Sequence, residues 1–508
     1  MPDGSSPARP AETPDAGPPD GYAGIVHQAA GSVKWATLAN LLPRFFTPVS
    51  SLVLAALLTP ADFGIVAVST LVVALARIVV GLGLGAAVVQ RQESVARAAS
   101  AAFWISFGLS VGLYGGLWLA APSLARLYQI PLLASVIRVS ALSLVLFALS
   151  TIPEALLQKS MQFRKLFWVS ALAQITHAVS SLGLALLGLG VWALVLGPLC
   201  AAAVRVLLSW SAARWFPSWS IDRAVLRSLL GFSVWVTVAG FQSWLFLYAD
   251  NALAGYYLGE RGVGVYSLGF SLSQLLPGLI IPALAAVAYP TFSALQNDRR
   301  AVGEGLLRLQ SVAAVVLFPA CFGLSAVAQA GTSLLYGEKW AGLGLVMQFM
   351  AIMPGLAHLW SLNAEAYRAL GRPDVWPKLA AASLLILLPL LVWAGPHGLV
   401  PFTVARFGGQ LVYPILHVVV AARVLGLPVS RQLRAWTVPL ACALPMYVVA
   451  ALLAWFLAPF EGLAGWLKLA GVVGSGVLLY AFLLWRIDAG LWTRSWLAGR
   501  QVLVRSRV

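Results

Sequence analysis

Three arginines interrupt long apolar stretches of the sequence, and their guanidinium groups are the first candidates for chemistry. Arg44, Arg77 and Arg406 each lie well inside such a stretch, where a charged side chain is costly to place and by default indicates a function. A planar guanidinium suits phosphate, because its donors grip two oxygens at once. We therefore expect these arginines to face a polar cavity and bind substrate; the alternative is an interhelical ion pair or a contact with a backbone carbonyl.

Polar groups of other kinds lie in the same apolar stretches. Asp250, followed by Asn251, could take up a proton or a cation, or could pair with an arginine from the other half of the chain. Both alternatives stay open, and the two residues are our candidates for ion coupling. Gln242 and Gln410 offer uncharged donors and acceptors that suit sugar hydroxyls, although interhelical hydrogen bonds use the same groups.

Further titratable residues inside or beside these stretches favour structural interpretations. Glu154 and Glu365 occupy matching ends of their stretches and are expected to pair with nearby basic turns. His177 and His358 are single histidines on apolar helices, which are more often hydrogen-bonded packing residues than proton carriers. Arg138 lies near the end of its stretch, so its side chain is expected to reach the membrane interface.

Metalloprotease and nucleotide-binding motifs are missing from the sequence. It contains no HExxH or Walker A string, and GLGLGAAV at residues 81–88 is predicted to lie within a membrane helix, where small residues permit close packing. The cysteines lack the spacing of a metal site and are interpreted as small packing residues. We therefore expect no enzyme activity, no metal and no cofactor. The cysteines are Cys200, Cys321 and Cys442.

The elements that must position these residues are membrane helices. Of the 508 residues, 60% are hydrophobic and 10% are charged, which is more apolar surface than a soluble domain can bury. A spanning helix needs about 20 apolar residues, and such runs recur along the chain. The sequence predicts an all-α integral membrane protein of about 14 transmembrane helices. The predicted segments are 34–57, 63–89, 98–121, 133–156, 167–188, 191–211, 228–257, 263–291, 303–328, 342–368, 376–394, 398–422, 435–457 and 465–485.

The net charge of +16 is distributed unevenly over the turns between these segments. The even-numbered turns and the two tails hold almost all of the Lys and Arg residues outside the segments. Such an excess is typical of cytoplasmic loops. It predicts a multi-pass membrane protein with both termini in the cytoplasm, and it argues against a nucleic-acid partner. The basic residues in odd-numbered turns are Arg126, Arg261, Lys339 and Lys468.

The chain also repeats itself at an offset of about 200 residues. LTPADFGIVAVS from Leu58 aligns with LGERGVGVYSLG from Leu258, which places Gly64 on Gly264. Such duplication is common where a substrate lies between two bundles that rock about it. The sequence therefore predicts two pseudo-symmetric six-helix lobes plus two C-terminal helices. The expected divisions are a disordered cytoplasmic tail at 1–29, lobes at 30–215 and 216–425, the added helices at 426–487 and a basic tail at 488–508.

Several strings resemble one transporter family. LLTPADFG, GLGLGAAVVQRQE, ALLQKSMQFRKL, SIDRAVLRSLLGFS and ALGRPD are similar in order and spacing to Wzx-type polysaccharide transporters of the colanic-acid exporter kind, in the multidrug/oligosaccharidyl-lipid/polysaccharide flippase superfamily. The resemblance implies two six-helix lobes around a central cavity. It also implies that an undecaprenyl-pyrophosphate-linked oligosaccharide is turned from the inner to the outer leaflet of a bacterial inner membrane. Arg44 and Arg77 match the basic residues of the first helices that contact pyrophosphate in such flippases.

Two rival functions remain at this point. A cation-coupled multidrug exporter of the same superfamily would favour acids and aromatic residues over arginines in its cavity. A polytopic glycosyltransferase or polymerase would carry acidic or arginine-rich external loops, which this sequence lacks. The expected partners are a lipid-linked oligosaccharide, membrane lipids and the polysaccharide polymerase machinery.

Overall fold

The computed structural model describes residues 46–219 and 223–491, together with residues 35, 38, 39, 42, 43 and 493. Side chains are not described at 220–236, 283, 358 and 359. The predicted site residue Arg44, the N-terminal tail and most of the C-terminal tail therefore lie outside the described residues. What is described consists of helices joined by short turns.

The helices have lengths suited to a bilayer. Within the described ranges, twelve helices are long and apolar enough to cross a membrane. One of these, Thr237–Ala294, has 58 residues and is broken at Gly259, so it covers most of predicted segment seven and all of segment eight. The first predicted segment is described from Phe46 to Leu57 as a shorter apolar helix. The prediction of an all-α, multi-pass membrane protein is confirmed. The helices are α2 (Pro60–Gly81), α3 (Leu84–Gln90), α4 (Val95–Tyr128), α5 (Leu133–Ser140), α6 (Leu142–Lys159), α7 (Phe163–Leu186), α8 (Val191–Ala213), α9 (Arg223–Ser273), α10 (Leu275–Ala294), α11 (Arg299–Tyr336), η1 (Gly337–Trp340), α12 (Leu343–Ala369), α13 (Val375–Ala394), η2 (Gly395–His397), α14 (Leu399–Gln410), α15 (Val412–Val424), α16 (Val429–Phe456) and α17 (Gly462–Ile487).

Local sequence signals account for several helix ends. Thr59 caps α2 through a reciprocal capping box with Asp62, and Pro60 occupies the first turn, as the residue types predict. Gly371 follows α12 with φ of 72°, a left-handed conformation that glycine adopts without strain. The expectation for residues 81–88 was wrong in one respect: the helix is interrupted there, because Leu82 and Gly83 adopt left-handed conformations between α2 and α3.

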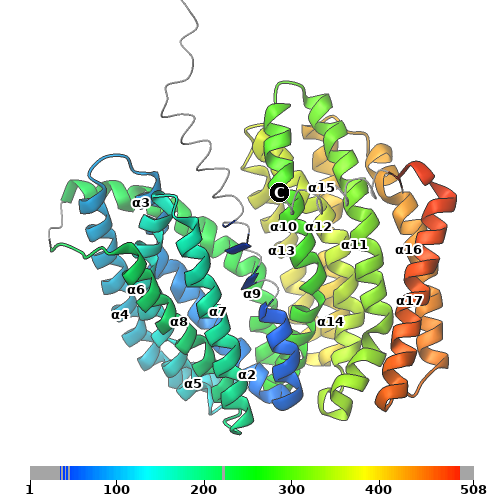
Figure 1. Cartoon of the computed structure of the whole chain (residues 1–508), viewed down its shortest axis with the longest axis horizontal. Helices are drawn as coiled ribbons and strands as arrows, with labels where there is room; N and C mark the ends of the chain where they lie inside the picture. The colour runs from blue at the N-terminus through cyan, green and yellow to red at the C-terminus, as the bar shows by residue number, and fades with distance from the viewer. Residues whose placement is uncertain are drawn as a thin grey trace, which may run out of the picture.

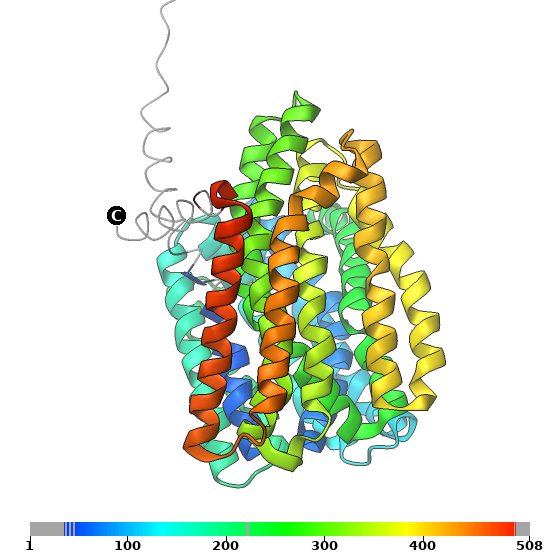
Figure 2. The same ribbon diagram turned by 90° about the vertical axis from the view of Figure 1, so that its right-hand side faces the viewer.

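The helices form two lobes, shown on opposite sides of Figure 1. The first lobe consists of α2–α8 and the second of α9–α17, whose first helix, α9, runs between the two lobes. Figure 2 shows α16 and α17 side by side on the outer surface of the second lobe. The two helices also contact each other and α11. The last two helices thus belong to the outer surface of the second lobe and do not lie between the two lobes.

The lobes meet at one end of the molecule, which we call the closed end. Two glycines mark the contact: a Cβ on Gly64 would lie 1.7 Å from the carbonyl oxygen of Glu260, and a Cβ on Gly264 would lie 1.8 Å from that of Pro60. A Cβ atom does not fit at such a distance from a backbone oxygen, so both positions require glycine. These are the two glycines that the internal repeat aligns, so the repeat brings equivalent turns of the two lobes together.

Side chains of η1 strengthen this contact. The indole Nε1 of Trp340 donates to the carbonyl of Ala55 at 2.8 Å, and Lys339 Nζ donates to that of Ala56 at 3.2 Å. The Phe63 and Trp340 rings pack edge to face at 5.3 Å. From the closed end the lobes diverge toward the opposite end (Figure 1). We call that opposite end the basic end, because its turns include Arg91, the Lys159–Lys165 turn and the Arg368–Lys378 turn.

Candidate functional site

A cavity of about 1290 Å³ lies inside the first lobe. Its described lining comes from α2, α3, α6, α7 and α8, with Ala39 and Pro43 from the chain before α2. It extends from mid-depth, at Arg77 and His177, to the basic end, at Gln90 and Gln158. Since these helices cross the membrane, the cavity provides polar surroundings at a depth where lipid would otherwise be.

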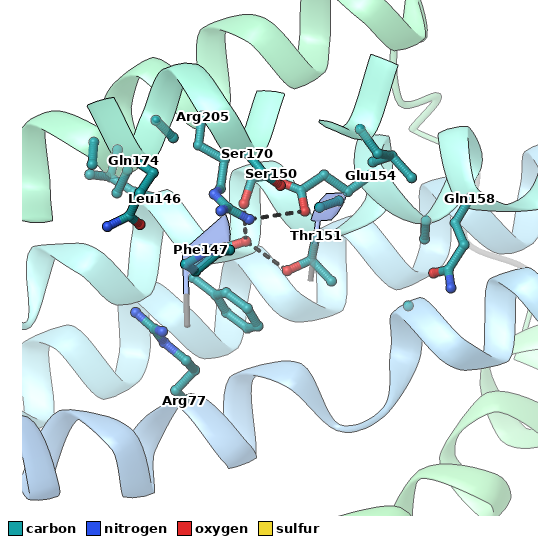
Figure 3. Close-up of a pocket in the computed structure, with 18 of the residues that line it drawn as sticks. Arg77, Leu146, Phe147, Ser150, Thr151, Glu154, Gln158, Ser170, Gln174 and Arg205 are labelled. Atoms are coloured by element: carbon teal, nitrogen blue, oxygen red, sulfur yellow. Dashed lines mark hydrogen bonds and ion pairs between the residues drawn. The ribbon is translucent and has the colours of Figure 1, made fainter. Parts of the chain in front are cut away.

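Arg77 projects into this cavity from α2, as Figure 3 shows. Its guanidinium carbon lies 5.0 Å from the centre of the Phe147 ring on α6, a distance typical of a cation–π contact. The ring supports one face of the guanidinium. This position agrees with the expectation that Arg77 faces a polar cavity.

A second arginine faces the same cavity from α8. Arg205 Nη1 lies 3.4 Å from Glu154 Oε2 of α6, and both side chains remain partly exposed, at 36% and 25%. Figure 3 shows this pair across the cavity from Arg77. The cavity therefore holds two guanidinium groups and one carboxylate among its described lining residues.

Uncharged polar side chains also line the cavity. Gln158 and Gln174 face the cavity (Figure 3), and Gln174 Nε2 donates to Thr47 Oγ1 at 3.4 Å. His177 lies on the wall at mid-depth. Amides and hydroxyls of this kind can exchange hydrogen bonds with sugar hydroxyls and with water.

The other predicted arginine, Arg406, lies in the second lobe and does not join Arg77. Its Nε donates to Asp250 Oδ2 at 2.8 Å, and the side chains are 7% and 3% exposed. The Tyr266 hydroxyl donates to the same oxygen at 2.7 Å, while the backbone N–H of Asn251 donates to Asp250 Oδ1 at 2.8 Å. Of the two alternatives for Asp250, pairing is the observed arrangement, but with an arginine of its own lobe.

The two predicted glutamines also lie apart from the large cavity. Gln242 of α9 donates to the carbonyl of Pro377 at the start of α13, which is the interhelical contact foreseen as its alternative. Gln410 and Arg406 line a separate cavity of about 210 Å³ in the second lobe, together with Trp376 and Tyr413. Of the predicted substrate-binding residues that are described, Arg77 lines the large cavity.

Sequence reasoning missed Arg205 as a site residue. It falls inside the predicted segment 191–211 and lies two turns before the end of α8. That position was the available signal. Glu154 was expected to pair with a basic turn, and it pairs instead with this arginine inside the cavity.

A two-lobed bundle of membrane helices with a polar cavity defines a class of transporter folds. The lipid II flippase MurJ, in an inward closed conformation, superimposes with a TM-score of 0.70 over 90% of this chain and 99% of its own, at 13% identity. An inward-facing multidrug resistance MATE family transporter of the MOP superfamily gives 0.61 over 77% of this chain and 98% of its own, at 15% identity. At such identities the likeness concerns the fold.

Sequence comparison identifies the family. The family model described as "Polysaccharide biosynthesis protein" matches residues 53–343, more than half of the chain, and the chain belongs to this family. The teichuronic acid biosynthesis protein TuaB of Bacillus subtilis is 25% identical over 91% of this chain and 96% of its own length. The succinoglycan biosynthesis transport protein ExoT of Rhizobium meliloti is 27% identical over 64% of this chain and 66% of its own length. The predicted resemblance to polysaccharide transporters is confirmed.

Proposed function

We propose that this protein is a flippase that moves an undecaprenyl-pyrophosphate-linked oligosaccharide from the inner to the outer leaflet of a bacterial plasma membrane. No covalent chemistry is involved in this function. The observation that carries the proposal is the cavity in the first lobe, in which Arg77 and Arg205 face polar space at membrane depth. The names of the relatives, which refer to surface polysaccharides and their transport, support it.

The cavity has the size and charge that such a headgroup needs. A pyrophosphate in hydrocarbon would be prohibitively costly, and guanidinium groups neutralise phosphate with charge-assisted hydrogen bonds. The volume of about 1290 Å³ exceeds the roughly 300–1,000 Å³ of typical small-molecule pockets, which leaves space for sugar beside the phosphates. The lipid tail would stay in the bilayer.

Alternating access gives the headgroup a route between the leaflets. The contact of Gly64 with the turn before Gly264 would seal the outer side, while the basic end, with both termini, would face the cytoplasm. Rocking of the lobes would then separate this contact and open the outer side. A polymerase that extends the sugar at the outer leaflet is the partner that this direction of transport requires.

Reconstitution tests the proposal. Proteoliposomes containing a fluorescent lipid-linked oligosaccharide report flipping as the loss of label accessible from one side. Arg77→Ala should slow flipping about tenfold or more, because a charge-assisted hydrogen bond is worth about 1.5–3 kcal/mol, and Arg77→Lys should retain part of the rate. Arg138→Ala is the matched control, because Arg138 packs on Trp118 away from the cavity lining.

Three results would contradict the proposal. Because the loss of a large side chain can slow transport for structural reasons alone, the informative failure is an Arg77→Ala rate equal to that of wild type. Transport of organic cations in place of the lipid would favour the drug exporter. Transfer of sugar by the purified protein would indicate an enzyme.

A further inference from the structure

The ion pair between Glu154 and Arg205 is weakly held. The contact between the two groups is long, 3.4 Å between Arg205 Nη1 and Glu154 Oε2, and both side chains retain access to the cavity. The other carboxylate oxygen, Glu154 Oε1, is buried and accepts no hydrogen bond from any described residue. A buried carboxylate oxygen without a donor is unfavourable, so the carboxylate is half satisfied in the observed arrangement.

The pair also occupies the place where an anion would bind. Arg205 and Arg77 line the same cavity, and Figure 3 shows Glu154 beside Arg205 on the opposite wall from Arg77. Among the lining residues that are described, Glu154 is the one acid. A phosphate entering the cavity would meet Arg205 already engaged and a negative charge beside it.

We propose that Glu154 is a built-in competitor of the substrate, which neutralises Arg205 while the cavity is empty and yields it to an anionic headgroup on loading. This inference rests on the proposed function, because it requires a phosphate in the cavity. Loading is then an exchange of partners at Arg205. Unloading is helped by the return of Glu154, which limits how tightly the headgroup is held.

The role of a competitor requires that the pair can open. A long, single contact with access to the cavity meets this requirement, since partly exposed ion pairs contribute little stability. Both glutamate and phosphate need the same planar donors of Arg205, and like charges close together in a cavity repel. An exchange therefore costs less than holding both anions at once.

Binding to the full-length protein in nanodiscs tests the inference. The probe is geranylgeranyl pyrophosphate, with geranylgeraniol as the ligand that lacks phosphate. Glu154→Gln should tighten binding of the pyrophosphate by about fivefold, the upper range for a partly exposed pair, and leave geranylgeraniol binding unchanged. Glu365→Gln is the matched control: it removes the same charge, but from a pair with Arg368 that does not line this cavity.

A double mutant shows whether the effect acts through Arg205. Arg205→Gln should weaken binding, and adding Glu154→Gln to it should give no further tightening. An unchanged or weaker affinity of Glu154→Gln, or tightening that persists without Arg205, would overturn the inference. If Glu154→Gln does not fold, Glu154→Asp, whose shorter side chain competes less, should give a smaller tightening.

Arg77→Ala separates this inference from the proposed function. If pyrophosphate binding depends on Arg77 but Glu154→Gln does not tighten it, the competitor role of Glu154 is wrong and the proposed phosphate site is supported. If the wild-type protein does not distinguish geranylgeranyl pyrophosphate from geranylgeraniol, the phosphate site itself is wrong, and the inference fails with it.

Discussion

The two lobes each hold an arginine paired with a carboxylate inside the bundle, yet the two pairs are built differently. In the second lobe, Arg406 Nε lies 2.8 Å from Asp250 Oδ2, and both side chains are almost fully buried. Both oxygens of Asp250 accept further hydrogen bonds, from Tyr266 and from the backbone of Asn251. In the first lobe, Arg205 and Glu154 are 3.4 Å apart, partly exposed and incompletely hydrogen-bonded.

The comparison indicates that a structural ion pair differs from an exchangeable one in the number of hydrogen bonds that the carboxylate accepts, more than in its charge. A buried carboxylate whose lone pairs are all engaged loses several interactions if its partner leaves. A carboxylate with one long contact loses little. We therefore interpret the pair of the second lobe as part of its framework and the pair of the first lobe as part of the site.

The largest effect is expected from breaking the framework pair. Asp250→Ala leaves a buried guanidinium without its partner, which typically destabilises a protein by about 3–5 kcal/mol. Glu154→Ala should destabilise it by about 1 kcal/mol or less, because its pair is partly exposed. Thermal unfolding of the detergent-solubilised variants measures both. Equal losses of stability would abolish the distinction between the two pairs.

A smaller loss of stability is expected when one hydrogen-bond donor to Asp250 is removed and the ion pair is kept. Tyr266→Phe deletes the hydroxyl that donates to Asp250 at 2.7 Å and leaves the ring packed edge to face on Phe402. A hydrogen bond to a charged group contributes about 1.5–3 kcal/mol, so the melting temperature should fall, but less than for Asp250→Ala. Tyr336→Phe is a suitable control, because that hydroxyl donates to a neutral carbonyl, that of Leu52. If the two Phe variants have the same melting temperature, the hydrogen bond to the Asp250 carboxylate contributes no more stability than a hydrogen bond to a neutral carbonyl.

The smallest effect concerns a third carboxylate, Asp374, which lies in water at the start of α13. Lys378 and Arg372 donate hydrogen bonds to it and lower its pKa to about 2. A depressed pKa means that the pairs stabilise the fold above the ordinary aspartate pKa of about 4. This contribution is lost as the pH falls through 2.

Asp374→Asn should therefore melt slightly below wild type at neutral pH, and the gap should close between about pH 4 and 2. High salt should also narrow the gap at neutral pH, because exposed pairs are screened. A gap that is independent of pH would show that the carboxylate charge of Asp374 does not contribute to stability.

Much of the fold could be predicted from the sequence because its signals are local. Apolar runs of spanning length indicate helices wherever lipid is the solvent, and the capping box at Thr59 and the glycine at 371 mark helix ends through neighbouring residues. The repeat aligns Gly64 with Gly264, and these are the glycines at which the two lobes touch. The interruption at Leu82 and Gly83 was missed, because small residues are compatible with both a packed helix and a break.

The candidate site could be predicted in part. Arg77 was found because a lone guanidinium in an apolar run is conspicuous. Arg205 was missed because a basic residue near a helix end is read as a loop residue, and the depth of a residue depends on where the helix begins in space. The arginine partner of each carboxylate could not be predicted from local sequence signals, since Arg205 and Glu154 are 51 residues apart and Arg406 and Asp250 are 156 residues apart.

Apolar length, charge and periodicity act on each segment separately, so they suffice to identify a bundle of membrane helices with one strongly basic end and an internal repeat. The tertiary structure decided which charges share a cavity and which are locked in pairs. It placed Arg77 with Arg205 and Glu154, and Arg406 with Asp250 and Tyr266. The physical reason is that pairing and hydrogen bonding depend on distances between helices, which packing of the whole bundle sets.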